Sequence, residues 1–319
     1  MNGRGSSARE TVVHALDCAA PESVLYELVA DASRWPTIMP PFIHVRYLDR
    51  SDTDERWQAW GRIGDRVQTW VSRRHLDPER GRITFEQEST DAPFAYMGGQ
   101  WDFEERDGGS HVVLQHRFTV NGDEAERARV VAAVDNNSMR DLAALCQLAT
   151  LGHPIDDLVF SFTDELRLPV SADEAYSFVN RSDLWPELLP HVSRVDLTEP
   201  RAGVQFMEMD TVTSDGQAHT TQSIRLCFPP GNIVYKQLVP PSLLLGHSGA
   251  WDFGEDEAGT VVAGRHSVAI NPKAVHNVLG PGCTLADARD YLREALGANS
   301  RATLSRAGGL VPAQSQGGR

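Results

Sequence analysis

The sequence lacks a long apolar segment. No uninterrupted apolar run approaches the roughly 20 residues that a helix needs to cross a bilayer. The first ten residues, MNGRGSSARE, are polar and contain no apolar core, so we expect no signal peptide. These two absences predict a cytoplasmic protein with no membrane association.

Cysteine is scarce as well. The four cysteines, Cys18, Cys146, Cys227 and Cys283, are widely separated, with no CxxC pair and no cluster of cysteine with histidine. Zinc sites and disulfide-rich scaffolds need closer, more regular spacing. We therefore expect four reduced core cysteines and no metal. The GxSxG, HExxH and dinucleotide glycine motifs are missing too, so we expect no cofactor and no hydrolase of those classes.

Positive charge is outnumbered. Lys and Arg total 30 against 44 Asp and Glu, which makes the formal net charge −14. Nucleic-acid binding and docking on anionic lipid both need clustered basic residues, so neither is expected. With 41% hydrophobic residues among 319, the chain is long and apolar enough for two ordinary domains.

What the chain does contain is an internal repeat. Three features recur 150 residues later in the same order: Trp35-Pro36 as Trp185-Pro186, Trp101-Asp102-Phe103 as Trp251-Asp252-Phe253, and His116 as His266. Near the ends the spacing grows to 162, as Asn137-Ser138 recurs as Asn299-Ser300. Fixed spacing indicates duplication. The second copy then carries about twelve extra residues near 271–282, where Asn-Pro and Gly-Pro-Gly predict a loop.

The duplication predicts two tandem domains, residues 1–152 and 153–307, divided near Gly152-His153-Pro154. The segment 308–319 is rich in Gly, Ser and Gln, and we expect it to be disordered. In the first copy, alternation predicts strands at 11–18, 43–49, 55–63, 65–76, 82–88, 94–105 and 110–120. A short helix after Pro21 and a long helix over 124–150 complete it.

The second copy repeats this order, with a strand at 158–168, a helix at 172–180, strands up to 270 and a final helix over 285–306. Thr284, with Asp287 three residues later, is typical of a helix N-cap. The pattern predicts an α+β fold, in which a curved antiparallel sheet wraps around one long helix. Such a sheet leaves an internal cavity, filled by side chains or by a ligand.

Strand alternation predicts which side chains face inward. His116 falls on the apolar face of 112–120, and His266 does so in the second copy. A histidine on such a face is most often a hydrogen-bonded core residue, and that interpretation stays open. The strand 66–74 is ambiguous: Arg74 faces the cavity if the Trp70 face points inward, and water otherwise. Asp141 lies on the cavity side of the last helix or on its solvated flank.

Three strings of the first copy carry a resemblance: Trp35-Pro36, Trp70-Val71-Ser72-Arg73-Arg74, and Pro93-Phe94-Ala95-Tyr96-Met97 followed by Trp101. Their order and spacing resemble the polyketide aromatase/cyclases, and the duplication resembles the didomain branch of that family. The resemblance implies two helix-grip domains of the Bet v 1/START type. It also implies cyclisation of a poly-β-ketone with loss of water, directed to the first ring between carbons C7 and C12.

In that family the substrate is carried on an acyl carrier protein, so the resemblance implies that carrier, other type II polyketide synthase components and a small-molecule substrate as partners. One subgroup acts on unreduced chains and another on chains reduced at C9. An acidic carrier would need a local group of arginines for docking. One such group is Arg62, Arg66, Arg73 and Arg80.

The resemblance also assigns site residues. The catalytic positions map onto Ser72, Arg74, His116 and Asp141. Positions that bind substrate are Trp35, Phe42, Trp70, Tyr96, Met97 and Trp101, with Trp185 and Trp251 in the second copy. Phe42 departs from the pattern, because a single-domain member has tyrosine there. The matching positions of the second copy are Ser223, Arg225, His247, His266 and Thr303.

These residue types suit an aldol closure followed by dehydration. Arg74 offers N–H donors to a developing oxyanion, and His116 has an ordinary pKa near working pH, so it can move a proton. Asp141 would orient that imidazole or share the proton transfer, and Ser72 would hold a ketone oxygen. The main alternative is a carrier of lipids or sterols on the same scaffold, because fold alone does not decide function.

Overall fold

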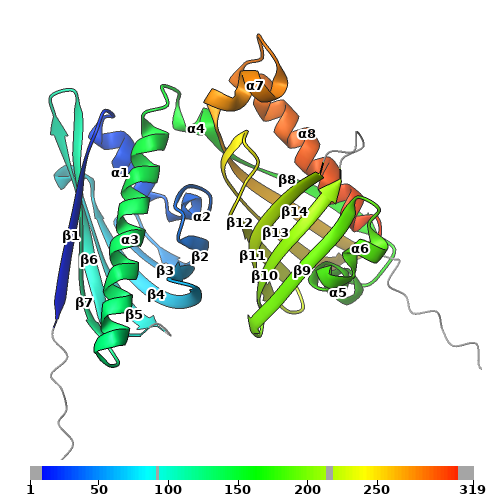
Figure 1. Ribbon diagram of the computed structural model, residues 1–319, viewed down its shortest axis with the longest axis horizontal. Coiled ribbons are helices and arrows are strands. Elements are labelled where there is room, and N and C mark those ends of the chain that lie inside the picture. Colours follow the sequence, from blue (N-terminus) through cyan, green and yellow to red (C-terminus); the bar gives the residue numbers. More distant parts are fainter. Residues whose placement is uncertain (1–8, 91–92, 213–217, 308–319) are drawn as a thin grey trace, which may run out of the picture. The chain divides into compact units, whose positions relative to one another are not determined.

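The protein forms two compact units, which divide between Ile155 and Asp156. The computed structural model describes residues 9–90, 93–212 and 218–307 (Figure 1). The division falls three residues after the boundary that we predicted. The segment 308–319, predicted to be disordered, and the first eight residues, in which no signal peptide was expected, lie outside the described residues.

Unit 1 is built on a seven-stranded antiparallel sheet with the strand order β1-β7-β6-β5-β4-β3-β2. The strands are β1 (Glu10–Cys18), β2 (Phe42–Arg50), β3 (Asp54–Ile63), β4 (Arg66–Asp77), β5 (Arg82–Thr90), β6 (Phe94–Arg106) and β7 (Gly109–Val120). Strands β2 to β7 follow one another as a meander, and β1 pairs with β7. The predicted strands of the first copy are all present.

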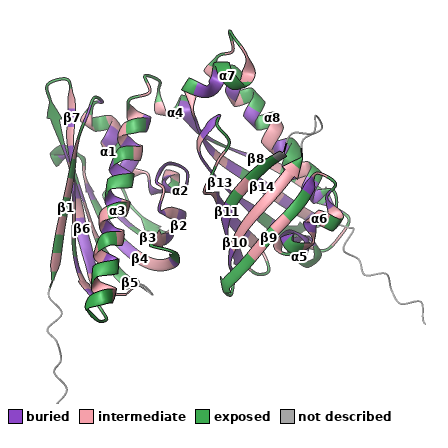
Figure 2. Cartoon of the chain, viewed as in Figure 1, coloured by how far each residue is buried: buried purple, intermediate pink, exposed green. Residues whose placement is uncertain are grey.

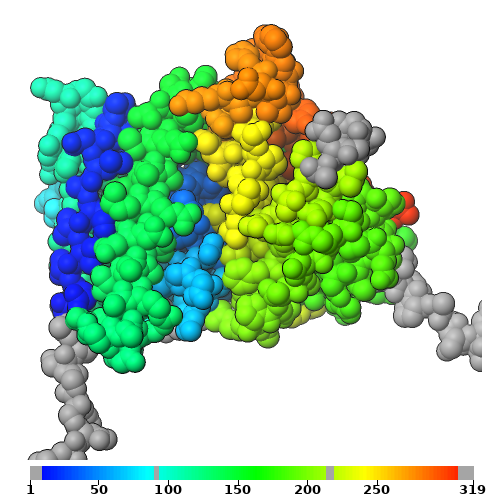
Figure 3. Space-filling view, in the orientation of Figure 1, coloured from blue at the N-terminus to red at the C-terminus, as the bar shows by residue number. Residues whose placement is uncertain are grey.

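One long helix, α3 (Glu124–Ala149), packs against this sheet, and shorter helices also contact it. These are α1 (Glu22–Ala30), η1 (Ala32–Arg34), α2 (Trp35–Ile38) and η2 (Pro78–Arg80). The side chain of Asp123 accepts a hydrogen bond from the Glu126 amide and caps α3. One side of α3 is buried and the other exposed (Figure 2). Helix α3 contacts β1 and β7, and Figure 3 shows it beside β1.

The packing of α3 against β1 brings two cysteines together. Cys18 at the end of β1 and Cys146 in α3 form a disulfide, with their Cα atoms 5.6 Å apart. The prediction of four reduced cysteines is therefore wrong for this pair. The two residues are 128 positions apart in sequence, so spacing alone gives no sign of their contact. Cys227 and Cys283 are free.

Unit 2 repeats the same architecture, with the strand order β8-β14-β13-β12-β11-β10-β9. Its strands are β8 (Val159–Leu168), β9 (Val192–Arg201), β10 (Val204–Val212), β11 (Ala218–Phe228), β12 (Asn232–Gln237), β13 (Leu244–Asp256) and β14 (Gly259–Ile270). Its helices include α4 (Ile155–Leu158), α5 (Ala172–Asn180), η3 (Ser182–Leu184), α6 (Trp185–Leu188) and α8 (Leu285–Leu304). The tandem α+β fold predicted from the sequence is confirmed.

The extra residues of the second copy differ from the predicted loop. They form η4 (Pro272–Ala274) and the short helix α7 (Val275–Leu279), because Val275 and Ala274 are buried and anchor the segment. The capping box at the start of α8 is as predicted: Thr284 and Asp287 bond each other's backbone amides. Among the described residues, no helix is long and apolar enough to cross a membrane.

Candidate active site

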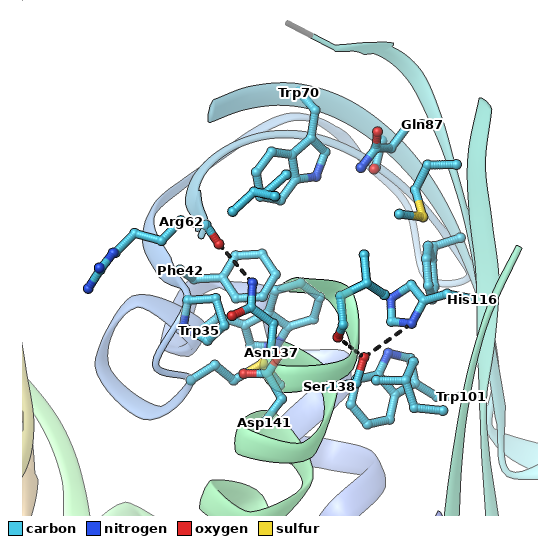
Figure 4. A pocket seen from close by; sticks show the side chains of 18 of the residues that line it. Trp35, Phe42, Arg62, Trp70, Gln87, Trp101, His116, Asn137, Ser138 and Asp141 are labelled. Carbon is cyan, nitrogen blue, oxygen red and sulfur yellow. Dashed lines mark hydrogen bonds between the residues drawn. The ribbon is translucent and has the colours of Figure 1, made fainter. Parts of the chain in front are cut away.

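Unit 1 contains a pocket of about 130 Å³ between its sheet, α3 and the α2 segment (Figure 4). Most of its wall is apolar, and much of that is aromatic: Trp35, Phe42, Trp70, Phe85, Phe94 and Trp101. An engineered apolar cavity of about 150 Å³ holds one benzene molecule. The pocket therefore has room of the order of one aromatic ring.

The residues predicted for the first site converge on this pocket. Trp70, Ser72 and Arg74 alternate along β4 and all line it, so the ambiguous strand turns its Trp70 face inward. His116 faces it from β7 and Asp141 from α3, where Asp141 is only 7% exposed. The solvated alternatives for Arg74 and Asp141 are therefore wrong. The predicted walls Trp35, Phe42, Met97 and Trp101 line the same pocket.

Tyr96 is the exception among the predicted walls of unit 1. It does not line the pocket, and the guanidinium of Arg9 lies over its ring at 4.6 Å. The ladder of β6 and β7 shifts register between Phe94 and Tyr96. This irregularity lets both Phe94 and Met97 face inward and turns Tyr96 to the other face. Simple alternation does not reveal such a shift.

Arg74 lines the pocket, but most of its donors are already engaged. Its Nη2 and Nε bond Glu55 at 2.5 and 3.2 Å, and the side chains of both residues are 1% exposed. The carbonyls of Val29 and Ala30, at the end of α1, accept from Nη1 and Nη2 at 2.7 and 2.6 Å. Of five N–H groups, one on Nη1 is left over. We predicted that the N–H donors of Arg74 are free to bind an oxyanion, and this is wrong for all but one of them.

His116 is held by a serine rather than by Asp141. Its Nδ1 lies 3.4 Å from the Ser138 hydroxyl, which donates to the Val134 carbonyl at 2.8 Å (Figure 4). The ring of Phe85 packs edge-on against the imidazole. Burial, with a smaller effect from His14, lowers the pKa of His116 to about 4. The imidazole is thus neutral at working pH, and its pKa is not poised there as expected.

Several polar residues of the pocket were not predicted from the sequence. Gln87 from β5 and Asn137 and Ser138 from α3 all line it, and Asn137 donates to the Arg62 carbonyl at 2.8 Å. A signal was present, because Ser138 recurs as Ser300 and Gln87 recurs as Gln237 at the spacing of the repeat. Among the described residues, no group of three or more His, Cys, Asp or Glu side chains is arranged to hold a metal.

In unit 2 the matching arginine and tryptophans are packed into the interior. Arg225 donates to the Val179 carbonyl and, at 2.6 Å, to Ser182, and lies over the Trp185 ring. Trp185 and Trp251 belong to the hydrophobic core of the unit. Thr303 is 8% exposed and donates to the Asn299 carbonyl on α8. Arg225 therefore anchors α5 much as Arg74 anchors α1.

The other second-copy positions form a buried polar cluster. His247, His266 and Ser223 are all less than 7% exposed. His247 Nε2 lies 3.1 Å from His266 Nδ1, and His266 Nε2 lies 2.8 Å from the Ser300 hydroxyl. Burial lowers the pKa of His247 to about 3, with a smaller effect of His266, and that of His266 to about 4. Both imidazoles are therefore neutral near pH 7.

We expect these buried histidines to make stability depend on pH. The folded state keeps His116 neutral down to about pH 4, whereas an unfolded histidine takes a proton near pH 6.5. The unfolded state therefore binds more protons between these values, so stability is full above pH 6.5 and falls below it. His116 alone should cost about 1–2 kcal/mol between pH 7.5 and 5, because pH 5 lies well below the pKa of the unfolded histidine and above that of the folded one.

Urea denaturation at pH 7.5 and 5.0 measures this loss. The variant His116→Asn should lose less stability between the two pH values than the native chain does. An equal loss in both proteins would show that His116 does not contribute to the pH dependence.

Known proteins resemble this chain over nearly its whole length. The actinorhodin polyketide synthase bifunctional cyclase/dehydratase of Streptomyces coelicolor is 54% identical, covering 93% of this chain and 95% of that protein. The granaticin polyketide synthase bifunctional cyclase/dehydratase of Streptomyces violaceoruber is 48% identical, covering 92% of each. The family described as polyketide cyclase/dehydrase and lipid transport matches residues 18–143.

Two solved structures share the two-unit architecture. The di-domain ARO/CYC BexL from the BE-7585A biosynthetic pathway superposes with a TM-score of 0.76 at 42% identity, covering 93% of this chain and 97% of that chain. The di-domain ARO/CYC StfQ from the steffimycin pathway gives 0.73 at 35% identity, with coverage of 94% and 97%. Both units of the chain are thus matched in sequence and in structure.

Proposed function

The chain belongs to the bifunctional cyclase/dehydratases of polyketide synthesis, and from this premise we propose that the pocket of unit 1 closes and aromatises the first ring of a polyketide. The activity is that of an aromatase/cyclase. The single observation that carries the assignment to this pocket is the meeting of Ser72, His116 and Asp141 in an aromatic-lined space the size of one ring. We propose a C7–C12 ring, a chain held on an acyl carrier protein, and a type II synthase.

Ring closure begins when a base removes a proton from a carbon next to a ketone. The resulting carbanion attacks a second ketone, which becomes an alkoxide and takes a proton. Dehydration then removes one further α-proton and expels hydroxide, which leaves as water with a proton from the pocket, and a C=C bond forms. No oxidant or cofactor is needed for these steps.

Each polar residue has a place in that sequence. Neutral His116, held by Ser138, accepts the α-proton, and Asp141 shares the proton transfer as we first proposed. Ser72 donates to the ketone oxygen, and the remaining N–H of Arg74 is available to donate to the same oxygen as negative charge develops on it. The aromatic walls exclude water and hold a flexible chain in one conformation, which sets the position of ring closure.

The carrier-docking surface stays a prediction. Of the proposed arginines, Arg73 pairs with Glu88 and Arg80 with Asp77 at 2.7 Å, which compensates part of their charge. The carrier would have to compete with these carboxylates. An acidic carrier can do so by offering several carboxylates at once, but the pairs weaken this group as a docking site.

Product analysis tests the proposed function. A minimal polyketide synthase and its carrier protein, with and without a ketoreductase, should give a mixture of shunt products without this protein and one C7–C12 aromatic product with it. The variant Asp141→Asn should restore the mixture, because it removes a carboxylate from the pocket. Comparing the products made with and without the ketoreductase shows whether the enzyme acts on a reduced or an unreduced chain.

The matched control is Asp135→Asn, which changes the same helix outside the pocket, where Asp135 is 46% exposed and pairs with His14. It should behave like the native protein. An unchanged product profile with the native protein in both systems would contradict the proposal and favour a ligand carrier.

A further inference from the structure

Three neighbouring strands of unit 2 carry a row of polar side chains with unused hydrogen-bonding atoms. Ser223 Oγ, Gln237 Oε1 and His247 Nδ1 are buried and have no partner among the described residues. Ser223 and Gln237 are directly opposed across β11 and β12. The last opposed pair of β12 and β13 is Lys236 with Ser248. Gln237 and His247 are the next residues on these two strands, so they continue the row. The three side chains therefore lie on adjacent strands of one sheet.

The row leads into the buried histidine cluster. The Tyr235 hydroxyl lies 3.0 Å from His266 Nδ1 and 3.5 Å from His247 Nε2. Ser300 on α8 bonds the far nitrogen of His266, so the cluster spans from the sheet to the helix. Gly249 has no side chain, and any side chain there would collide with the Tyr235 hydroxyl. The fold therefore makes room for this phenol beside the two imidazoles.

The same positions of unit 1 belong to the pocket. Ser72 and Gln87 are opposed across β4 and β5, as Ser223 and Gln237 are, and both line the unit 1 pocket. Figure 4 shows Gln87 there. Two of the pocket's apolar residues are replaced by polar ones in unit 2. His247 stands where unit 1 has Met97, and Tyr235 stands where it has Phe85. Unit 2 thus keeps the polar row and adds to it.

Unused polar atoms in a protein interior are rare, because each loses its bonds to water. Gln237 Oε1 can only accept, so its missing partner is a hydrogen-bond donor. Ser223 can donate or accept, and His247 Nδ1 does either according to its tautomer. Ser223 and Gln237 carry no charge, and burial keeps the His247 imidazole neutral near pH 7, so the row offers no charge to a ligand. The partner that fits is neutral and carries hydroxyl groups.

Aromatic rings lie beside the histidine cluster into which the row leads. The ring of Phe162 stacks on His266 with centroids 5.1 Å apart. Trp251 lies against Gly264, on the strand that carries His266. Aromatic walls favour a flat ring system, as they do in unit 1.

We propose that unit 2 is a second ligand-binding site, in which Ser223, Gln237 and His247 hold a neutral aromatic molecule that carries hydroxyl groups. Tyr235 and His266 orient His247 from behind. The site is separate from the pocket of unit 1, and it is tested by measuring ligand binding rather than product formation. Failure of the ring-closure test would therefore leave this proposal standing, and the reverse also holds.

Titration of the full chain with phloroglucinol, a single benzene ring that carries three hydroxyl groups, tests the proposal by calorimetry. We expect two molecules bound per chain. The double variant Tyr235→Phe/His247→Met installs the side chains that unit 1 has at the same positions. It should weaken one of the two binding events by about tenfold or more and leave the other unchanged, because it removes hydrogen bonds worth about that factor.

A second variant, Ser223→Ala/Gln237→Met, should weaken the same event, and Gln87→Met should weaken the other one. Thermal unfolding monitored by circular dichroism shows which variants are folded. One folded unit 2 variant is enough to test the proposal. No binding by the native chain, or a single binding event that only Gln87→Met weakens, would overturn the proposal. Two events that neither folded unit 2 variant alters would overturn it as well.

Discussion

Replacing His116 with asparagine should slow formation of the aromatic product by about 10²- to 10⁴-fold, the usual contribution of a positioned acid or base. Asparagine is polar enough for the site but cannot accept a proton near neutral pH. Because the imidazole acts on the reacting carbon, kcat should fall while KM changes little. The rate is measured in the reconstituted synthase, with the variant added at saturating and at limiting carrier protein.

The pH profile separates proton transfer from a structural role. With the pKa of His116 lowered to about 4, the native enzyme should keep a constant kcat/KM from about pH 8 down to about pH 5 and lose it near pH 4. A histidine with an ordinary pKa would lose activity near pH 6.5 instead. A loss at 6.5, or a His116→Asn variant of native activity, would contradict the assignment.

Two further variants serve as controls. Ser138→Ala removes the group that positions the imidazole, so we expect a loss smaller than that of His116→Asn. His14→Asn removes a histidine whose Nε2 pairs with Asp135 outside the pocket. It should retain activity within a few fold.

The architecture was predictable because it depends on local periodicity and on repetition. Strand alternation located the strands of the first copy, and the spacing of 150 residues carried the same order into the second. Alternation also placed His116 on the inner face, since that strand has no irregularity at His116. The fold and the direction of this side chain are therefore properties of short stretches of sequence.

What escaped prediction depends on contacts between distant segments. The disulfide of Cys18 and Cys146 exists because α3 packs on β1. Tyr96 faces outward because of a register shift between two strands. The partners of Arg74 lie 19, 44 and 45 residues away in the sequence. None of these contacts can be recognised from the spacing of residues. The recurrence of Ser138 as Ser300 can, but it served only to identify the duplication and not to predict a site residue.

Replacing Arg74 with methionine should destabilise unit 1 by about 3–5 kcal/mol, because it leaves the buried carboxylate of Glu55 without its main partner. Arg50, which is 54% exposed, bonds the other oxygen of Glu55 at 3.0 Å and compensates only part of the charge. The carbonyls at the end of α1 also lose their donor. Urea denaturation followed by circular dichroism and tryptophan fluorescence measures the loss.

Arg225→Met is the matched control in unit 2. Arg225 holds the end of α5 and contacts Trp185 as Arg74 holds α1 and contacts Trp35, but the described residues offer it no ion pair. This variant should lose less stability, about 1–3 kcal/mol, because it leaves hydrogen-bond acceptors without a donor but leaves no charge unpaired. The double variant Glu55→Met/Arg74→Met should regain part of the stability lost by Arg74→Met, because both buried charges are then gone.

These comparisons decide what the pocket arginine does. If Arg74→Met lowers activity and stability together, and the double variant recovers stability without activity, Arg74 both supports α1 and acts on the substrate through its remaining N–H. If the double variant recovers both, the arginine is a positioning residue, and the oxyanion is stabilised by Ser72 and its neighbours. If Arg74→Met is as stable as the native chain, the ion pair with Glu55 does not contribute to stability, because the unpaired Glu55 carboxylate is the reason for the expected loss.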